Sequence, residues 1–133
     1  MSEHRSLYLD TSALGRVLLG EPDREPILQE LARFERLLAS RLMRVELRRL
    51  ALRKGLLDAA EQMLAGVAML PIDPEVLHAA ETLTPASVAT LDAIHLATAI
   101  RVAAAGLLDA VMTYDARLAA GCAEHGIEVI APT

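Results

Sequence analysis

The sequence predicts an α/β fold: a three-layer α/β/α sandwich around a central, mostly parallel, four- to five-stranded sheet. Two observations lead to this prediction. Short apolar runs alternate with segments of helical apolar spacing along the whole chain. Hydrophobic residues make up 53% of the 133 residues and aromatic residues only 2%, so the core must be aliphatic, which favours helices packed on a small sheet.

In the first half of the chain, the expected elements follow one another with short breaks. They are a buried strand over 6–10, a helix over 11–21, a turn over 21–26, a helix over 27–37, a short strand over 37–40, and helices over 41–57 and 58–66. Thr11 or Ser12 is the expected N-cap of the first helix, because short hydroxyl side chains favour that position. The helix over 27–37 is predicted from its apolar spacing between Ile27 and Phe34.

The second half continues the alternation. Its expected elements are a buried strand over 67–73, a helix over 74–83, a break over 84–87, an Ala-rich helix over 88–106, a strand over 109–115, a helix over 116–126 and a last strand over 127–132. Pro74 stands at a favourable first position of its helix. No internal repeat, linker or low-complexity segment interrupts the pattern, so we expect one domain over 1–133.

Cysteine content and hydropathy limit the classes of protein to consider. Cys122 is the only cysteine, so an intrachain disulfide and a cysteine-based zinc site are excluded. The N-terminus lacks the long apolar core of a signal peptide, and the apolar stretches are too short to span a membrane. We therefore expect a soluble cytoplasmic protein without a membrane partner.

Basic residues gather in one part of a chain whose net charge is −5. Eight of the 13 lysines and arginines lie between positions 33 and 54. Most of them are arginines, whose guanidinium group suits bidentate contact with phosphate or carboxylate. This stretch could therefore hold a polyanion, and a solvated helix face is the alternative interpretation.

Asp10 and Asp115 each follow a short apolar strand and precede a helix. In an open parallel sheet, the carboxyl ends of the strands line the crevice where ligands bind. Each acid could instead be a helix cap. Two strands that end in the same way favour a shared site over two independent caps. Thr113 lies on the approach to Asp115 and could orient a carboxylate or a water molecule.

Glu46 lies on the apolar face of its predicted helix, at an angle between those of Leu42 and Leu50. Acidic side chains are rarely buried without a partner. Glu46 could therefore form a buried ion pair with Arg49 or Arg53. The functional alternative is a carboxylate that points into a polar pocket.

Asp92 lies in the first turns of the Ala-rich helix, on a mostly apolar face. Its charge suits a helix N-terminus, but a carboxylate among apolar neighbours should have a partner. His95 is one turn further along and could be that partner, although such a histidine is more often a structural residue of the core.

One shared site explains all four acids, which are Asp10, Glu46, Asp92 and Asp115. Clustered carboxylates repel one another and need a compensating cation. Oxygen ligands alone suit Mg²⁺ or Mn²⁺ and not zinc. Magnesium held by carboxylates commonly serves phosphate chemistry, in which it activates water and neutralises developing charge.

Four sequence blocks, one for each acid, resemble the PIN-domain family over nearly the whole chain, and most closely its VapC-type toxins of prokaryotic toxin–antitoxin pairs. The blocks are "LYLDTSAL" with Asp10 and Ser12, "RLMRVELRRL" with Glu46, "LDAIHLATAI" with Asp92, and "VMTYDARLAAGCAEHGIEVIAP" with Thr113 and Asp115. Each block alone is a weak signal, whereas all four in order are a specific one. No acid of the family pattern is missing, so we expect an active member.

The resemblance implies a single PIN domain over 1–133, with a parallel sheet between helices. It also implies an endoribonuclease that depends on Mg²⁺ or Mn²⁺ and hydrolyses RNA phosphodiester bonds. The implied partners are an RNA substrate, a second copy of the chain in a homodimer, and a cognate VapB-type antitoxin that covers the site.

Roles for individual residues follow from the resemblance and the pattern together. They are Asp10, Glu46, Asp92 and Asp115 as metal-coordinating and catalytic acids, Ser12 and Thr113 as supporting hydroxyls, and Arg44, Arg48 and Arg49 as candidate contacts to RNA or antitoxin.

Three other functions compete with this hypothesis. PIN domains also act in RNA processing without an antitoxin, but the small size of the chain favours a toxin. A haloacid-dehalogenase-like phosphatase would need a second Asp where Ser12 stands and a suitably placed lysine, whereas Lys54 is the only lysine. A receiver-like or structural interaction module would leave the four acids on apolar faces unexplained.

Overall fold

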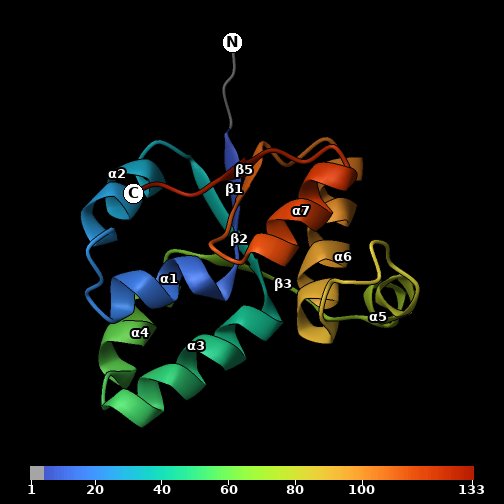
Figure 1. Ribbon diagram of the computed structural model, residues 1–133. Coiled ribbons are helices and arrows are strands. Elements are labelled where there is room, and N and C mark those ends of the chain that lie inside the picture. The colour runs from blue at the N-terminus through green and yellow to red at the C-terminus, as the bar shows by residue number, and fades with distance from the viewer. Residues whose placement is uncertain (1–4) are drawn as a thin grey trace.

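The computed structural model describes residues 5–133 and confirms the α/β class, with a parallel five-stranded sheet between two layers of helices (Figure 1). The strands are β1 (Ser6–Leu9), β2 (Arg36–Ser40), β3 (Ala68–Leu70), β4 (Ala110–Met112) and β5 (Val129–Ile130). The helices are α1 (Thr11–Leu18), α2 (Arg24–Leu31), α3 (Arg41–Lys54), α4 (Leu57–Leu64), α5 (Pro74–Glu81), α6 (Thr90–Ala104) and α7 (Ala116–Glu124). No helix of the described residues is long and apolar enough to cross a membrane.

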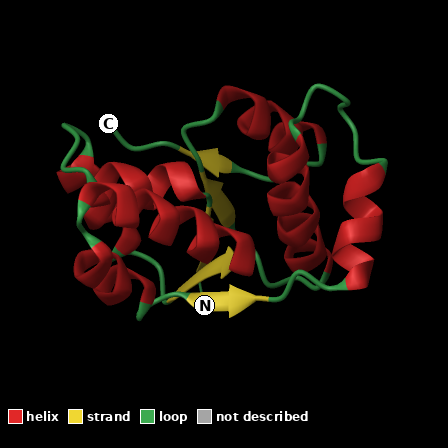
Figure 2. Cartoon of the chain, turned by 90° about the horizontal axis from the view of Figure 1, so that it is seen from below, coloured by secondary structure: helices red, strands yellow, loops and turns green. Residues whose placement is uncertain are grey.

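Side chains of β1 alternate between two hydrophobic clusters, one on each face of the sheet. Leu7 and Leu9 join a cluster that also holds residues of α1, α2, α3 and α4. Tyr8 joins the other cluster, together with Leu96 of α6 and Leu118 of α7. Figure 2 shows the strands between these two groups of helices. The molecule is therefore the three-layer sandwich that the sequence predicts.

The strand order is β3-β2-β1-β4-β5, and every neighbouring pair is parallel. The order reverses between β1 and β4, and open parallel sheets bind ligands at the carboxyl ends of strands at such a point. Leu9 pairs with Met112 there, and the backbone N–H of Asp10 donates to the Met112 carbonyl at 3.1 Å. The turns that follow β1 and β4 therefore lie side by side.

Helix α2 differs from the helix expected over 27–37, because it spans Arg24–Leu31. Tertiary pairing ends it early, since the backbone N–H of Arg36 donates to the carbonyl of Arg5 at 3.1 Å and holds this stretch beside β1. Phe34 fits the helical spacing but is buried outside the helix, with the Arg5 guanidinium 4.5 Å from its ring centroid. The expected helix was therefore wrong in its second half.

Candidate active site

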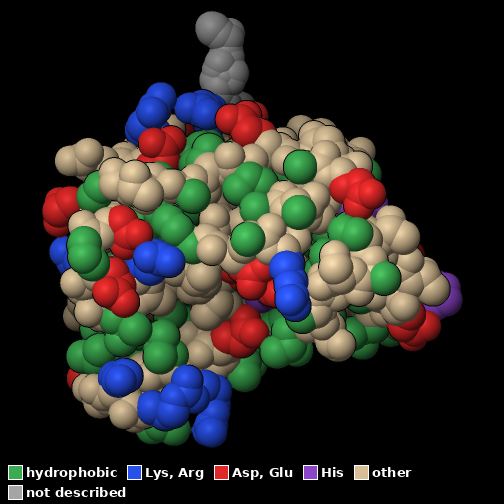
Figure 3. Space-filling model, in the orientation of Figure 1, with side chains coloured by type: hydrophobic (Ala, Val, Ile, Leu, Met, Phe, Trp, Pro, Cys, Tyr) green, Lys and Arg blue, Asp and Glu red, His purple; other side chains and the backbone are tan. Residues whose placement is uncertain are grey.

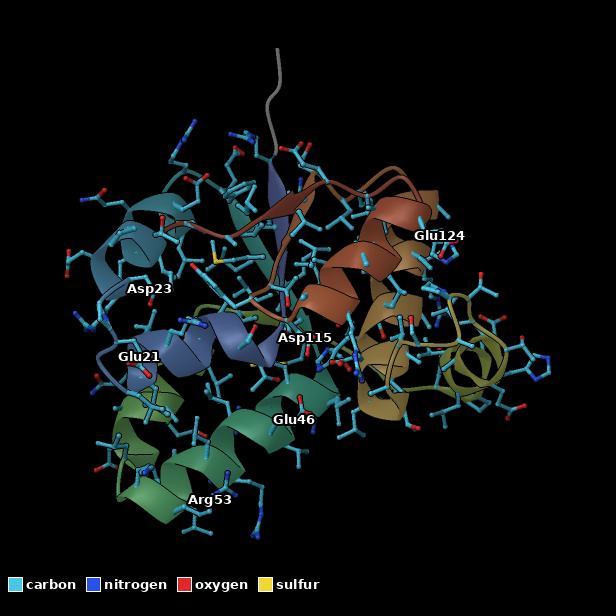
Figure 4. The ribbon with its side chains drawn as sticks, in the orientation of Figure 1. Glu21, Asp23, Glu46, Arg53, Asp115 and Glu124 are labelled. Carbon is cyan, nitrogen blue, oxygen red and sulfur yellow. The ribbon has the colours of Figure 1, made fainter. Side chains whose placement is uncertain are left out.

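A pocket of about 610 Å³ opens at the carboxyl end of β1, between α1, α3 and α6. The four acids of the sequence blocks all line it, namely Asp10, Glu46, Asp92 and Asp115. Figure 4 shows Glu46 on α3 and Asp115 at the start of α7 on the same side of the molecule. Figure 3 shows acidic side chains in the middle of this face and basic side chains gathered below them, at the bottom.

Asp10 follows β1 directly and is itself the N-cap of α1. Its backbone is extended (φ −83°, ψ 155°), as an N-cap requires, and its Oδ2 accepts the backbone N–H of Ser12 at 3.4 Å. The prediction of Thr11 or Ser12 as the cap was therefore wrong. Asp10 is only 4% exposed, so its carboxylate depends on protein donors to replace water.

Two hydroxyl groups hold the Asp10 carboxylate. Ser12 Oγ donates to Asp10 Oδ2 at 2.7 Å, and Thr113 Oγ1 donates to the same oxygen at 2.9 Å. The Ser12 hydroxyl also accepts the backbone N–H of Tyr114 at 2.9 Å. The Thr113 hydroxyl likewise accepts the backbone N–H of Asp115 at 3.1 Å. These bonds lock the turn after β1 to the turn after β4 and orient the carboxylate between them.

Asp115 is the N-cap of α7, where its Oδ1 accepts the backbone N–H of Leu118 at 2.9 Å. The same residue lines the pocket. Capping and site formation were alternatives at the level of sequence, but here one side chain does both. The reason is geometric, because a cap that directly follows a parallel strand lies at the carboxyl edge of the sheet.

Glu46 has partners other than the arginines that the sequence suggested. Its Oε1 accepts hydrogen bonds from the Thr11 hydroxyl and from His95 Nε2, the latter at 3.0 Å. Within residues 5–133, no ion pair joins Glu46 to Arg49 or Arg53, although both arginines line the pocket. Burial alone would raise the pKa of Glu46, but the bonds from His95 and Thr11 outweigh it and hold the pKa below its usual value.

Asp92 lies in the first turn of α6 and is half-buried. Burial, above all, and then the charges of Asp115 and Asp10 raise its pKa to about 6. His95 lies one turn further along α6, but its imidazole nitrogens bond to Glu46 and Tyr8. Asp92 therefore has no hydrogen-bond donor among the described residues to offset its burial and the neighbouring charges.

His95 is the residue of this site that the sequence left undecided. It is 1% exposed, and its Nδ1 lies 3.0 Å from the Tyr8 hydroxyl. Its Nε2 also lies 3.7 Å from Asp10 Oδ1, so the imidazole stands behind two of the acids. The sequence pointed to His95 only as a possible partner of Asp92, one turn away on the same helix face. Its actual hydrogen-bond partners are Tyr8 of β1 and Glu46 of α3.

The arginines of α3 divide into two groups. Arg49 lines the pocket of the four acids. Arg44 and Arg48 both pair with Glu61 of α4, Arg44 at 2.8 Å, and they line a neighbouring groove with Arg49. Of the three arginines proposed to contact RNA or antitoxin, the structure thus places Arg49 beside the acids and the other two only in the neighbouring groove.

The chemistry of the donors fits a hard divalent cation. All four acids present carboxylate oxygens, which suit Mg²⁺ or Mn²⁺, and a cation would relieve the repulsion that raises the pKa of Asp92. Among residues 5–133, no three acidic, histidine or cysteine side chains are already gathered as metal ligands would be. Asp10, Glu46 and Asp115 each direct one carboxylate oxygen to a protein donor.

Similarity to known proteins identifies the family of this chain. Residues 7–124 match the family model described as "PIN domain". Ribonuclease VapC47 of Mycobacterium tuberculosis (strain CDC 1551 / Oshkosh) is 38% identical, over 95% of this chain and 96% of the relative. Ribonuclease VapC46 of Mycobacterium tuberculosis (strain ATCC 25618 / H37Rv) is 36% identical, over 96% of this chain and 98% of the relative.

Among solved structures, the chain is similar to a toxin–antitoxin complex from Klebsiella pneumoniae. The TM-score is 0.74 with 20% sequence identity, over 96% of this chain and 98% of the other. This likeness supports the fold, and the family model covers most of the sequence. The chain therefore belongs to the PIN-domain family.

Proposed function

We propose that this chain is an endoribonuclease that depends on Mg²⁺ or Mn²⁺ and acts as the toxin of a toxin–antitoxin pair. The observation that carries the proposal is the meeting of four carboxylates, from α3, α6 and the turns after β1 and β4, around one pocket. Relatives of similar length are named ribonucleases, which supports RNA as the substrate class.

In this proposal, Asp10, Asp92 and Asp115 hold the metal ion, and Glu46 completes the site through a water molecule. Bound there, the ion would lower the pKa of a water molecule and neutralise charge on the scissile phosphate. Glu46 Oε1 is occupied by Thr11 and His95, whereas Oε2 has no hydrogen-bond partner among the described residues. Oε2 is therefore the atom that takes the proton from the attacking water.

Other side chains prepare the site for the reaction. Ser12 and Thr113 keep the Asp10 carboxylate in one orientation through the bonds described above. Arg49 is exposed at the rim of the pocket and would bind a phosphate next to the one that is cleaved. Arg44 and Arg48 would extend this contact along α3, either to RNA or to an antitoxin.

A partner antitoxin is part of the proposal. One similar solved structure is a toxin–antitoxin complex, and two others of the same fold are FitAB and VapBC2, each bound to a DNA fragment. We expect a small VapB-type antitoxin to be encoded next to this chain and to cover the pocket, and we expect the chain to form a homodimer. Co-expression with that neighbour should give a stable complex with low ribonuclease activity. An RNA-processing enzyme would form no such complex.

The test of the nuclease is Asp10→Asn, assayed on total cellular RNA with Mg²⁺. Asparagine can still cap α1, because it is among the preferred cap residues, so the fold should remain. Cleavage should fall by at least a hundredfold, as for loss of an essential metal ligand. Asp58→Asn removes the same charge from an exposed position on α4 and should keep full activity. Undiminished cleavage by folded Asp10→Asn would reject the assignment.

A further inference from the structure

A buried chain of hydrogen bonds runs from the core of the sheet to the pocket. The Tyr8 hydroxyl on β1 lies 3.0 Å from His95 Nδ1 on α6, and His95 Nε2 lies 3.0 Å from Glu46 Oε1 on α3. Tyr8 and His95 are each 1% exposed, and their rings meet edge to face at 77°. Three elements far apart in the sequence therefore share one polar network.

The direction of each hydrogen bond follows from the chemistry of the groups. A glutamate carboxylate has only acceptor oxygens at neutral pH, so Glu46 Oε1 accepts from its partners. His95 Nε2 must then carry the hydrogen and donate it. In a neutral imidazole the other nitrogen is an acceptor, so Tyr8 donates to Nδ1. A phenol carries its proton at neutral pH, so the Tyr8 hydroxyl can donate it.

A merely structural histidine would satisfy its nitrogens within the core. Here only one nitrogen faces the core, through Tyr8, and the other faces two acids of the pocket, Glu46 at 3.0 Å and Asp10 at 3.7 Å. The Glu46 side chain has three rotatable bonds. Without His95, its carboxylate would keep a hydrogen bond to only one of the described residues, Thr11. Loss of the imidazole would therefore release the carboxylate to other rotamers.

We propose that Tyr8 and His95 form a positioning pair that fixes Glu46 Oε1 and keeps Oε2 available in the pocket. Neither residue touches the reacting atoms, so both act through Glu46. Tyr8 sets the tautomer of His95, and His95 sets the rotamer of Glu46. The pair deepens the proposed function and rests on its metal site, because a fixed Oε2 matters only where the pocket binds a metal ion.

The first test reads the tautomer directly in metal-free protein. Histidine labelled with ¹⁵N, observed by NMR at mildly alkaline pH, should show His95 protonated at Nε2 and unprotonated at Nδ1. The His95 signals are identified by their absence from the spectrum of His95→Gln. Tyr8→Phe keeps the ring and removes the donor, so the Nδ1 signal should shift strongly or the tautomer should change. A His95 protonated at Nδ1 in the wild-type protein would overturn the proposal.

The second test measures the consequence for metal binding. Tyr8→Phe should raise the Kd for Mn²⁺ by about tenfold or more, as does the loss of other groups that orient metal ligands. Titration calorimetry without RNA measures this Kd. The kcat of this variant for RNA should fall similarly, with KM little changed. Val111→Ala trims the same apolar cluster as Tyr8 and should lower the Tm without changing the Kd. An unchanged Kd in Tyr8→Phe, or an equal loss in Val111→Ala, would overturn the proposal.

A conservative exchange separates positioning from packing. Glutamine can still donate a hydrogen bond to Glu46, whereas leucine fills similar space and cannot. His95→Gln should therefore keep more Mn²⁺ affinity than His95→Leu, at comparable Tm. Equal affinities in these two variants would show that packing alone matters and would overturn the proposal.

The outcomes also separate this proposal from the ribonuclease function. If the wild-type protein cleaves RNA and Tyr8→Phe is unaffected in Kd and kcat, the positioning pair is rejected and the nuclease stands. If the wild-type protein binds Mn²⁺ but leaves RNA intact, and Tyr8→Phe weakens that binding, the nuclease is rejected and the pair stands as a determinant of the metal site.

Discussion

Thr113 donates a hydrogen bond to Oδ2 of Asp10 at 2.9 Å, although 103 positions separate the two residues in the chain. The same hydroxyl accepts the backbone N–H of Asp115, the acid that caps α7. One small side chain thus connects the two strand ends on which the pocket is built. Its removal should affect both the stability of the fold and the order of the site.

Thr113→Val keeps the branched shape of the side chain and removes its hydroxyl. The backbone N–H of Asp115 would lose its acceptor, and the Asp10 carboxylate would lose one of its donors. We expect the free energy of unfolding to fall by about 1–3 kcal/mol, measured by urea denaturation, and RNA cleavage to fall with it. Thr113→Ser keeps the hydroxyl and should retain cleavage. Equal losses in both variants would show that the hydroxyl is not the cause.

Because the pKa of Asp92 is raised, removing its charge should stabilise the fold by an amount that depends on pH. A folded-state pKa of about 6, above the ordinary 3.8, means that the folded protein favours the protonated acid. The stability contributed by this group is therefore present below about pH 4 and is lost as the pH rises to about 6. At neutral pH this lowers the free energy of unfolding by about 1 kcal/mol, because solvent screens the half-exposed carboxylate.

Asp92→Asn should consequently stabilise the metal-free protein at neutral pH and leave it unchanged at acidic pH. Urea denaturation at the two pH values checks this. In the wild-type protein, Mn²⁺ affinity should fall as the pH drops below about 6, because protons compete with the metal for Asp92. A gain from Asp92→Asn of the same size at both pH values would contradict the repulsion described here.

Arg49 and Arg44 offer a matched pair on one helix. Arg49 lines the pocket of the four acids. Arg44 does not line this pocket and instead forms an ion pair with Glu61, at 2.8 Å. If Arg49 binds a phosphate, Arg49→Gln should raise KM for RNA several-fold and lower the slope of log affinity against log salt by about 1. Arg44→Gln removes the same charge and should change both quantities less. Equal effects would mean that α3 acts only through its total charge.

Close packing of α7 on α6 predicts a sensitive glycine. A Cβ at Gly121 would lie 2.8 Å from Leu96 Cδ2 and 3.1 Å from Val88 Cγ2. Gly121→Ala should therefore lower the free energy of unfolding by about 1–3 kcal/mol, measured by urea denaturation, because the neighbours must move. Gly66→Ala is the control, because no atom lies within 4 Å of its added Cβ. A gain in stability at Gly121 would contradict the packing.

The fold and the positions of the acids could be predicted because both depend on local pattern. Alternation of apolar runs with helical spacing identified strands and helices, and a carboxylate after a buried strand marks a sheet edge wherever the strand pairs. Glu46 could be found because an acid on an apolar helix face needs an explanation.

Partners distant in the sequence could not be predicted in the same way. The end of α2 depends on the carbonyl of Arg5, and the partner of Glu46 is His95, which lies 49 positions away. The arginines near Glu46 in sequence were the natural candidates, yet the imidazole reaches it from another helix. The sequence left the cap of α1 open between Asp10 and its neighbours Thr11 and Ser12, because all three residue types suit that position.

Because of the strand order, the pocket can form only late in the synthesis of the chain. β1 is made first but lies in the middle of the sheet, and β4, which pairs with it, is made near the end. A ribosome that has translated only the first three strands has not yet made Thr113 or Asp115. The site therefore stays incomplete throughout most of the protein's own synthesis, and a product terminated before Asp115 carries no complete centre.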